Sequence, residues 1–558
     1  MNAPSHQTGH PRRWQILTVL LVSLLVVVLD NTVLNVALKT IQQDLEATQT
    51  EIVWAINSYT LVFAALLFTW GVLGDRYGRK KILVIGMLLF GLASALSAFA
   101  TDPMQLILAR AFMGVGGASV LPVTLAIITV VFPPHERGKA IGLWAAAVGG
   151  AVAIGPLLGG FLLEHFWWGS VFLINVPIVI VGVAGILVLV PESRNPNPGR
   201  LDPLGLLMSI TGLLLLVYGI QHGGDSQDWF SVGVAGAIVA GTAILVAFLW
   251  LEWRSDHPSL DMSLFRIKSF SASLTTVSLT FAAMTGSLLF LAFYMQLVRG
   301  YSPLQAGAFT LPVAVGQLLA APRSAKMVER FGARKVIGFG LILAGGVFVS
   351  FVLLEPQTPA WVLLVTWFFL GFGLGNVIAP ATTRMTLAVP PEKSGAGSAV
   401  QNTVRQVAAA MGIAVLSSVV AVAYTNSIEG QPGIADLPQP LQGAVTDSIG
   451  GAYEATGRAV AAGALDPAQA AGIQSAAVDS FMGAFHLAAL GAGLLVLIAL
   501  ILLLWRLPAE AEHAAWGGHA GDAQADPAIL PDAFEGGTDA EMPNTSAPAA
   551  PRAPGAPG

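Results

Sequence analysis

The chain has 558 residues, of which 55% are apolar and only 11% are charged, and its mean hydropathy is +0.72. A water-soluble surface needs about 25–35% charged residues, so this composition excludes an ordinary soluble protein and predicts that most of the chain faces lipid. The absence of cysteine excludes disulfides, thiol catalysis and metal centres with cysteine ligands. The net charge of −5 comes from the last 52 residues, 507–558, which hold eight acids and one arginine, and no basic stripe indicates a nucleic-acid partner.

Fourteen apolar stretches are each long enough to cross a bilayer, whose ~30 Å core needs about 20 residues of helix. The first follows a short polar leader that lacks a small-residue cleavage site, so we interpret it as a retained helix and not as a signal peptide. In chain order the predicted spans are 14–37, 51–73, 82–101, 104–127, 138–163, 168–190, 203–221, 230–251, 270–295, 303–322, 336–354, 360–381, 395–423 and 482–505.

The positions of lysine and arginine predict how these spans are oriented. With the N-terminus in the cytoplasm, the cytoplasmic segments hold 22 of the 27 basic residues, and the outer loops hold only Lys39, Arg299 and Arg458. A missed or additional span would invert every later loop and remove this bias. We therefore predict a multi-pass protein of the cell membrane with both termini cytoplasmic.

An internal repeat predicts how the spans are grouped. The loop DRYGRKK at 75–81 reappears as ERFGARK at 329–335, and FPPHERG at 132–138 reappears as VPPEKSG at 389–395. These shifts of 254 and 257 residues make helices 1–6 and 9–14 two copies of one six-helix unit. A unit with an even number of helices keeps its orientation when it is duplicated, so the copies are parallel, and in such transporters the site lies near the membrane midplane between the halves.

The predicted fold is therefore an all-α integral membrane protein. Its predicted parts are a cytoplasmic leader (1–13), a first six-helix bundle (14–190), an insert with helices 7 and 8 and a cytoplasmic linker (191–269), a second bundle (270–506) that includes an outer loop (424–481), and a disordered acidic cytoplasmic tail (507–558).

Six ordered motifs resemble those of the major facilitator superfamily and its group of fourteen-span drug:proton antiporters. They are Gly71–Lys81 after the second helix, Leu29–Leu38 in the first, Arg110–Gly117 in the fourth, Gly155–Gly160 in the fifth, Phe172–Pro177 in the sixth and Gln401–Gln406 in the thirteenth. The resemblance covers about residues 14–506 and implies two six-helix bundles plus two inserted helices. It also implies a proton-coupled antiporter that exports hydrophobic or amphipathic drugs, including antibiotics, by alternating access. The alternative is an exporter of lipids or glycolipids on the same fold.

Asp30 is the one acid placed well inside a predicted span, and a buried ionisable group at that depth needs a reason. At helical rise Asp30 lies ~12 Å below the outer end of its helix, and Arg110 lies ~10 Å below the same face. Because the two depths agree, we expect the two side chains to pair. The pair is either a permanent structural salt bridge or a proton switch, in which protonation of Asp30 releases Arg110.

The loop after the second helix contains Gly71, Asp75, Arg76, Gly78 and Arg79. Its basic residues satisfy the orientation rule by themselves, but that rule does not explain an acid set among glycines. The resemblance implies that Asp75, within reach of an arginine, locks the cytoplasmic side in one state.

The fifth helix carries the exporters' antiporter motif, with Gly155, Pro156, Gly159 and Gly160. Its glycines are either ordinary small-residue packing or, together with the proline kink, part of a tightly packed gate that bends.

Arg405 is the second arginine inside a span, ~15 Å deep in the thirteenth helix. Either backbone carbonyls, Gln401 or Asn402 satisfy it, or it faces the cavity. The other residues at positions typical of a cavity, any of which could bind substrate, are Asn35, Asn57, Tyr294, Gln317, Asn376 and Asn402.

The chain lacks the phosphate-binding loop G-x4-G-K-[ST], which argues against ATP as the energy source. An enzyme would need histidines or carboxylates clustered at one depth, so we predict a non-enzymatic transporter with no metal and no cofactor. Its predicted partners are a small hydrophobic or amphipathic substrate, protons and the lipid bilayer, and we expect a monomer.

Overall fold

The computed structural model describes residues 9–47, 49–196, 202–226, 229–254, 262–390 and 393–507, and within these every regular element is a helix. The predicted tail lies outside the described residues from position 508 onward, as do residues 1–8 of the leader. The helices up to the inserted pair are α1 (Arg13–Asp44), α2 (Gln49–Tyr77), α3 (Arg79–Ala98), α4 (Pro103–Gly117), α5 (Val120–Val131), α6 (Pro134–His165), α7 (Ser170–Leu173), α8 (Asn175–Leu189), α9 (Pro203–Ser226) and α10 (Val232–Arg254).

The later helices form the second half of the chain. They are η1 (Met262–Arg266), α11 (Lys268–Phe293), the π-helical turn η2 (Tyr294–Val298), α12 (Pro303–Ala308), α13 (Leu311–Phe331), α14 (Ala333–Ser350), η3 (Phe351–Leu353), α15 (Ala360–Leu387), α16 (Ser394–Ile428), α17 (Gln439–Asp447), α18 (Ile449–Ala461) and α19 (Pro467–Arg506).

Each of the fourteen predicted spans coincides with one helix or with two consecutive helices in the described part of the chain. Twelve of these segments are long and apolar enough to cross a membrane. The other two, α6 and α13, occupy the fifth and tenth positions and have 32 and 21 residues, which exceeds the ~20 that a bilayer needs. The predicted all-α membrane fold is confirmed.

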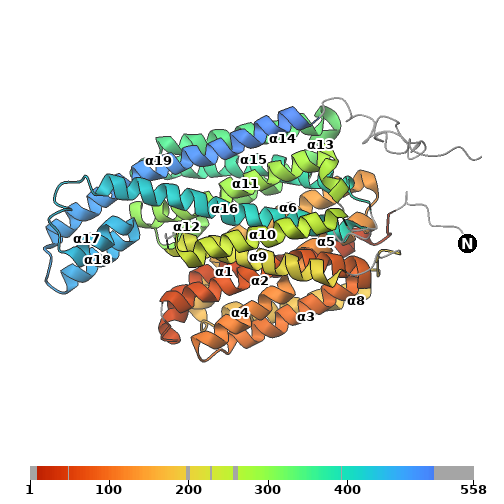
Figure 1. Cartoon of the computed structure of the whole chain (residues 1–558), viewed down its shortest axis with the longest axis horizontal. Coiled ribbons are helices and arrows are strands. Elements are labelled where there is room, and N and C mark those ends of the chain that lie inside the picture. The colour runs from red at the N-terminus through yellow and green to blue at the C-terminus, as the bar shows by residue number, and fades with distance from the viewer. Residues whose placement is uncertain are drawn as a thin grey trace, which may run out of the picture. The chain divides into compact units, whose positions relative to one another are not determined.

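The predicted outer loop is more regular than its sequence indicates. Helix α16 continues to Ile428 and α19 begins at Pro467, so both extend into the segment 424–481. Between them α17 and α18 pack against each other, and α18 also packs against α19 (Figure 1). Proline and serine start these helices: Pro438 precedes α17, and the Ser448 hydroxyl accepts a hydrogen bond from the Gly451 amide at the start of α18.

The helices of the two halves meet along two lines. Helix α2 packs against α16, and α6 packs against α13 and α15. The inserted helices α9 and α10 pack against each other, and α9 also touches both α2 and α16 (Figure 1). The inserted pair therefore lies alongside one of the two lines of contact.

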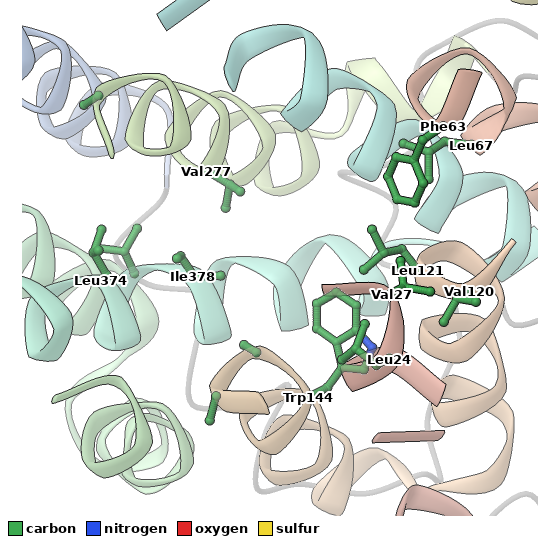
Figure 2. Close-up of a cluster of buried hydrophobic side chains, with 14 of the residues drawn as sticks. Leu24, Val27, Phe63, Leu67, Val120, Leu121, Trp144, Val277, Leu374 and Ile378 are labelled. Atoms are coloured by element: carbon green, nitrogen blue, oxygen red, sulfur yellow. The ribbon is translucent and has the colours of Figure 1, made fainter. Parts of the chain in front are cut away.

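One apolar core continues through both halves. Figure 2 shows part of it, to which the helices contribute Leu24 and Val27 (α1), Phe63 and Leu67 (α2), Val120 and Leu121 (α5), Trp144 (α6), Val277 (α11), and Leu374 and Ile378 (α15). Large apolar side chains also point outward, such as Leu92, Phe112 and Val188. An apolar exterior around a packed apolar interior is what a membrane helix bundle requires, because lipid replaces water as the solvent.

We use two names for the ends of this bundle. The basic end is named for the arginines and lysines near it, such as those within 76–81 and 330–335. It is the end at which α2, α5, α8, α13 and α19 finish, with Tyr77, Val131, Leu189, Phe331 and Arg506 as their last residues. The far end is the opposite one, where α1, α3, α6 and α16 finish and where α17 and α18 lie.

Candidate functional site

The Asp30 carboxylate and the Arg110 guanidinium form a buried ion pair between α1 and α4. The exposed fractions of the two residues are 2% and 1%. Arg110 Nε also donates to the Ala55 carbonyl of α2 at 3.2 Å. The depth argument from the sequence thus places the two residues correctly, because the rise of a helix fixes the depth of each side chain.

A third residue completes the pair. Asn175 Nδ2, at the start of α8, donates to the second carboxylate oxygen of Asp30 at 3.0 Å and lies 3.0 Å from the Ser94 hydroxyl of α3. Each oxygen of Asp30 therefore has its own donor. We did not single out Asn175 from the sequence, although a polar amide beside long apolar runs was a usable signal.

Aromatic rings enclose the arginine. The guanidinium carbon of Arg110 lies 4.3 Å from the centre of the Tyr59 ring and 5.9 Å from that of Phe172. The glycines of α4 allow this close approach, since a Cβ on Gly114 would lie 2.7 Å from the Tyr59 carbonyl oxygen. A ring face favours a cation, so these contacts stabilise the charged arginine in a site without water contact.

Asp75 joins the two halves at the basic end. Arg79 donates to its Oδ1 from Nε at 2.9 Å and from Nη2 at 2.7 Å. The backbone amides of Gly395 and Ala396 donate to Oδ1 and Oδ2 at 2.9 and 2.8 Å. These amides belong to the first turn of α16, so the carboxylate also neutralises the positive end of that helix.

The glycines of this loop make room for the contact. A Cβ on Gly71 would lie 2.6 Å from the Gly395 carbonyl oxygen. Gly78 has a φ of +115°, which favours glycine, and a Cβ there would meet the carboxylate of Glu192 at 2.7 Å. Glu192 accepts hydrogen bonds from the amides of Lys80 and Lys81 and so caps α3, a role that we did not expect from the sequence. Arg76 lies with its guanidinium carbon 5.7 Å from the centre of the Tyr77 ring.

The repeat is not symmetric at this point. Glu329, which corresponds to Asp75 in the second copy of the loop, has an exposed side chain. The first copy of the loop thus carries the buried acid.

Helix α6 connects the first half to the second through small residues. On one face, a Cβ on Gly155 would collide with the Thr32 side chain of α1, and one on Gly159 would lie 3.0 Å from the Val33 carbonyl oxygen. On the other face, a Cβ on Gly142 would lie 2.7 Å from the Ala321 carbonyl oxygen of α13, and one on Gly149 would collide with Gln317. Gly160 lies on the same helix, and the side chain of Pro156 lies outside the described part of the structure.

A cavity of about 570 Å³, which we call the large cavity, lies between the halves. Its wall comes from α2, α9, α11, α16, the α17–α18 pair and α19. The aromatic and polar side chains in it are Asn57, Thr60, Gln221, Phe281, Thr285, Phe290, Phe293, Gln406, Ser417, Tyr424, Asp447, Ser448 and Phe481. Among the residues we predicted for substrate binding, Asn57 lines this cavity.

A smaller cavity of about 120 Å³, which we call the Arg405 cavity, lies between α6, α11, α13, α14, α15 and α16. Gln317 and Arg405, two of the predicted residues, line it, and Phe281 belongs to the walls of both cavities. Neither Asp30 nor Arg110 lines the large cavity or the Arg405 cavity.

The other predicted residues lie elsewhere. The Tyr294 hydroxyl donates to the Glu355 carbonyl at 2.8 Å, and the amides of Asn376 and Asn402 donate to carbonyls of their own helices at 2.8 Å. The side chain of Asn35 lies outside the described part of the structure. Among the described residues, no three histidine, aspartate or glutamate side chains gather in a way that could hold a metal ion.

Comparisons with known proteins identify the family to which the chain is related. The sequence profile of the Major Facilitator Superfamily matches residues 20–413. The chain is 36% identical over 486 residues to the multidrug efflux pump LfrA of Mycolicibacterium smegmatis, which covers 86% of this chain and 95% of that protein. It is 37% identical over 421 residues to a puromycin resistance protein of Streptomyces alboniger, covering 74% and 83%.

A third relative is similar in sequence, and one solved structure is similar in fold. The methyl viologen resistance protein SmvA of Salmonella typhimurium is 33% identical over 510 residues, covering 90% of this chain and 99% of that protein. The human organic anion transporter TETRAN has the same fold, with a TM-score of 0.56, 16% identity and coverage of 88% of this chain and 100% of its own. The chain is therefore a multi-pass membrane protein that belongs to the Major Facilitator Superfamily of transporters.

Proposed function

We propose that this protein is a proton-coupled antiporter that exports hydrophobic or amphipathic drugs, including antibiotics, across the cell membrane by alternating access. The names of its relatives, a multidrug efflux pump and proteins of puromycin and methyl viologen resistance, support drug export. The distribution of lysine and arginine supports an orientation with the basic end and both termini in the cytoplasm.

The structure corresponds, in this proposal, to a state whose cytoplasmic side is closed. The contact of Asp75 with α16 holds α2 and α16 together at the basic end. The large cavity lies between the same two helices farther along, and Phe293, Tyr424 and the α17–α18 pair border it towards the far end. Opening of the basic end requires that the Asp75 contact breaks, so this contact sets how often the cytoplasmic side accepts substrate.

Asp30 is the group that we assign to proton exchange. Its carboxylate is held by one cationic donor, Arg110, and one neutral donor, Asn175. Protonation removes the negative charge and so breaks the ion pair that joins α1 to α4 at this depth. Because the pair lines neither the large cavity nor the Arg405 cavity, we assign its exchange with water to another state of the transport cycle.

A chain of contacts leads from this pair to the interface between the halves. Thr32, two residues after Asp30, packs against Gly155 of α6, and the opposite face of α6 packs against α13 through Gly142 and Gly149. A shift of α1 therefore acts on α6, and α6 borders the Arg405 cavity through Trp144 and Gly149. This is a physical route by which the charge on Asp30 affects the substrate region.

The large cavity suits an amphipathic cargo. Four phenylalanines and one tyrosine supply its aromatic surface. The amides of Asn57, Gln221 and Gln406 and the carboxylate of Asp447 are among its hydrogen-bonding groups. Sites for drug-sized molecules have volumes of about 300–1,000 Å³ and are mostly apolar with a few polar groups, and the large cavity has both properties.

The buried pair of Asp30 and Arg110 is the observation that carries the proton-coupled part of the proposal. The test is an efflux panel of dyes, antibiotics and lipids in cells that express the protein, with and without a protonophore. We expect export of amphipathic dyes and antibiotics, and loss of that export when the protonophore is added. Export of every transported compound that continues unchanged with the protonophore would contradict proton coupling, and export of lipids alone would identify the other substrate class.

A further inference from the structure

Among the described residues, Arg405 is a buried cation without a counter-charge. Its exposed fraction is 5%, and its guanidinium carbon lies 4.8 Å from the centre of the Phe281 ring. Within the described part of the chain no carboxylate pairs with it, and its buried Nε has no hydrogen-bond partner. Among the described residues neither neighbour is seen to accept a hydrogen bond from it: the Gln401 amide donates to the Thr382 hydroxyl, and the Asn402 amide donates to the Ser398 carbonyl while its buried Oδ1 has no partner.

A second buried donor lines the same cavity. The indole Nε1 of Trp367 on α15 is buried and lacks a partner among the described residues. Gln317 of α13 adds an amide to the wall. A buried donor without an acceptor destabilises the protein, and more so when it is charged, so a cavity with two such donors is suited to a ligand that supplies acceptors.

The size of the Arg405 cavity limits what can enter it. A volume of about 120 Å³ has room for a small polar group, whereas a whole drug-sized molecule needs several hundred Å³. The large cavity is adjacent, because Phe281 lines both and because Gln406, the next residue after Arg405, faces the large cavity. The two cavities share the Phe281 side chain, and movement of that side chain would let one ligand place its apolar body in the large cavity and a polar end beside Arg405.

We propose that Arg405 and Trp367 form a subsite that binds the anionic oxygen group, such as a carboxylate, of an amphipathic aromatic substrate whose apolar body occupies the large cavity. A guanidinium matches the two oxygens of a carboxylate, and the indole N–H supplies a further donor. The identity of this substrate as cargo rests on the proposed exporter function, whereas the binding itself does not.

The competing explanation is that Arg405 is purely structural and is held in place by the Phe281 ring. The two explanations differ in what they predict for a matched pair of ligands. A structural arginine affects the stability of the protein but does not distinguish a carboxylate from a neutral amide of the same shape. A binding arginine does distinguish them.

The test uses the full chain, purified in detergent, and two fluorescent probes of the same size, dansylglycine and dansylglycinamide. Binding is measured by the fluorescence change, with protein-free micelles as the blank, and a thermal unfolding curve is recorded for each variant. The variants are Arg405→Gln, Arg405→Lys and Trp367→Phe, which removes the N–H and keeps a ring. Arg323→Gln is the matched control, because it removes one positive charge from an exposed position.

We expect the unmodified protein and Arg323→Gln to bind dansylglycine at least about tenfold more tightly than dansylglycinamide. Arg405→Gln should abolish this preference, Arg405→Lys should keep part of it, and Trp367→Phe should weaken the binding of dansylglycine several-fold. Equal affinities of the unmodified protein for both probes, or a full preference in Arg405→Gln, would overturn the proposal. If Arg405→Gln does not fold, an unchanged affinity of Trp367→Phe for dansylglycine would overturn it. If cells show proton-dependent efflux but the purified protein does not prefer dansylglycine, the subsite proposal is wrong and the exporter function stands. If the purified protein shows this preference but cells show no efflux, the exporter function is wrong and the subsite proposal stands.

Discussion

The carboxylate of Asp75 accepts a hydrogen bond of 2.9 Å from the backbone amide of Gly395, a residue 320 positions later in the chain. One acid of the first half thus caps the first turn of α16 in the second half. Arg79 binds the same oxygen, so the acid is held from both sides. The corresponding acid of the second copy, Glu329, is exposed, and this difference provides an internal control.

Asp75→Asn should slow transport without preventing substrate binding. The amide keeps one acceptor oxygen but loses the negative charge, which at a helix N-terminus and in a charged hydrogen bond is worth about 1–2 kcal/mol. Loss of this free energy makes the state with a closed basic end rarer, and the transport cycle must pass through that state. We therefore expect transport to fall about tenfold while the Kd for substrate changes by less than about twofold. Both are measured in parallel, as uptake into inverted vesicles and as ligand binding to purified protein. Glu329→Gln should resemble the unmodified protein, and an unchanged rate in Asp75→Asn would refute the gating role.

The contacts of Asp75 and Asp30 show how far the sequence alone could lead. Depth along a helix follows from a fixed rise per residue, so the pairing of Asp30 with Arg110 could be predicted from two positions and two helix ends. The interaction of Asp75 with Gly395 could not, because a backbone amide is available in every residue and only the packing of α2 against α16 selects it.

Arg405 and Asn175 illustrate the same limit. The sequence left open whether Arg405 is satisfied by neighbours or faces a cavity, because hydropathy defines the span but not its rotation relative to the helices around it. Asn175 belongs to a recognised motif, but its role depends on the approach of α8 to α1, a contact across 145 positions. The helix pattern is thus largely local information, and the composition of the site is not.

Asp30→Asn should uncouple the transporter from the proton gradient. Asparagine is close in size and keeps an acceptor for Asn175 or Arg110, but it does not exchange a proton. In proteoliposomes with an imposed pH gradient we expect gradient-driven accumulation to fall at least about tenfold, which corresponds to about 1.4 kcal/mol, and substrate binding to persist. The control is Asp44→Asn, which changes an exposed acid on the same helix. Accumulation by Asp30→Asn with an undiminished dependence on the gradient would exclude Asp30 from proton coupling.

Gly155→Ala tests whether the α1–α6 contact is part of the mechanism. A Cβ at this position collides with Thr32, whereas a Cβ at Gly150 of the same helix has no neighbour within 4 Å. Overpacking costs about 1–3 kcal/mol, so Gly155→Ala should lower the unfolding temperature and the transport rate, and Gly150→Ala should leave both near those of the unmodified protein. Equal behaviour of the two variants would mean that α1 and α6 can separate freely.

Tyr424→Phe tests what holds α17 and α18 at the wall of the large cavity. The Tyr424 hydroxyl donates to the Val445 carbonyl at 2.9 Å, next to a hydrogen bond from Thr425 to the Thr446 carbonyl. Loss of one such bond costs about 1 kcal/mol, so α17 should detach about five times more often, and limited proteolysis between α16 and α17 should accelerate by the same factor. Tyr453→Phe on α18 is the matched control, since the Tyr453 hydroxyl makes no hydrogen bond within the described residues.

Because Asp447 and Ile449 border the large cavity, faster detachment of α17 should also raise the rate of substrate release. Faster proteolysis with unchanged release would show that α17 and α18 cover the cavity without controlling it.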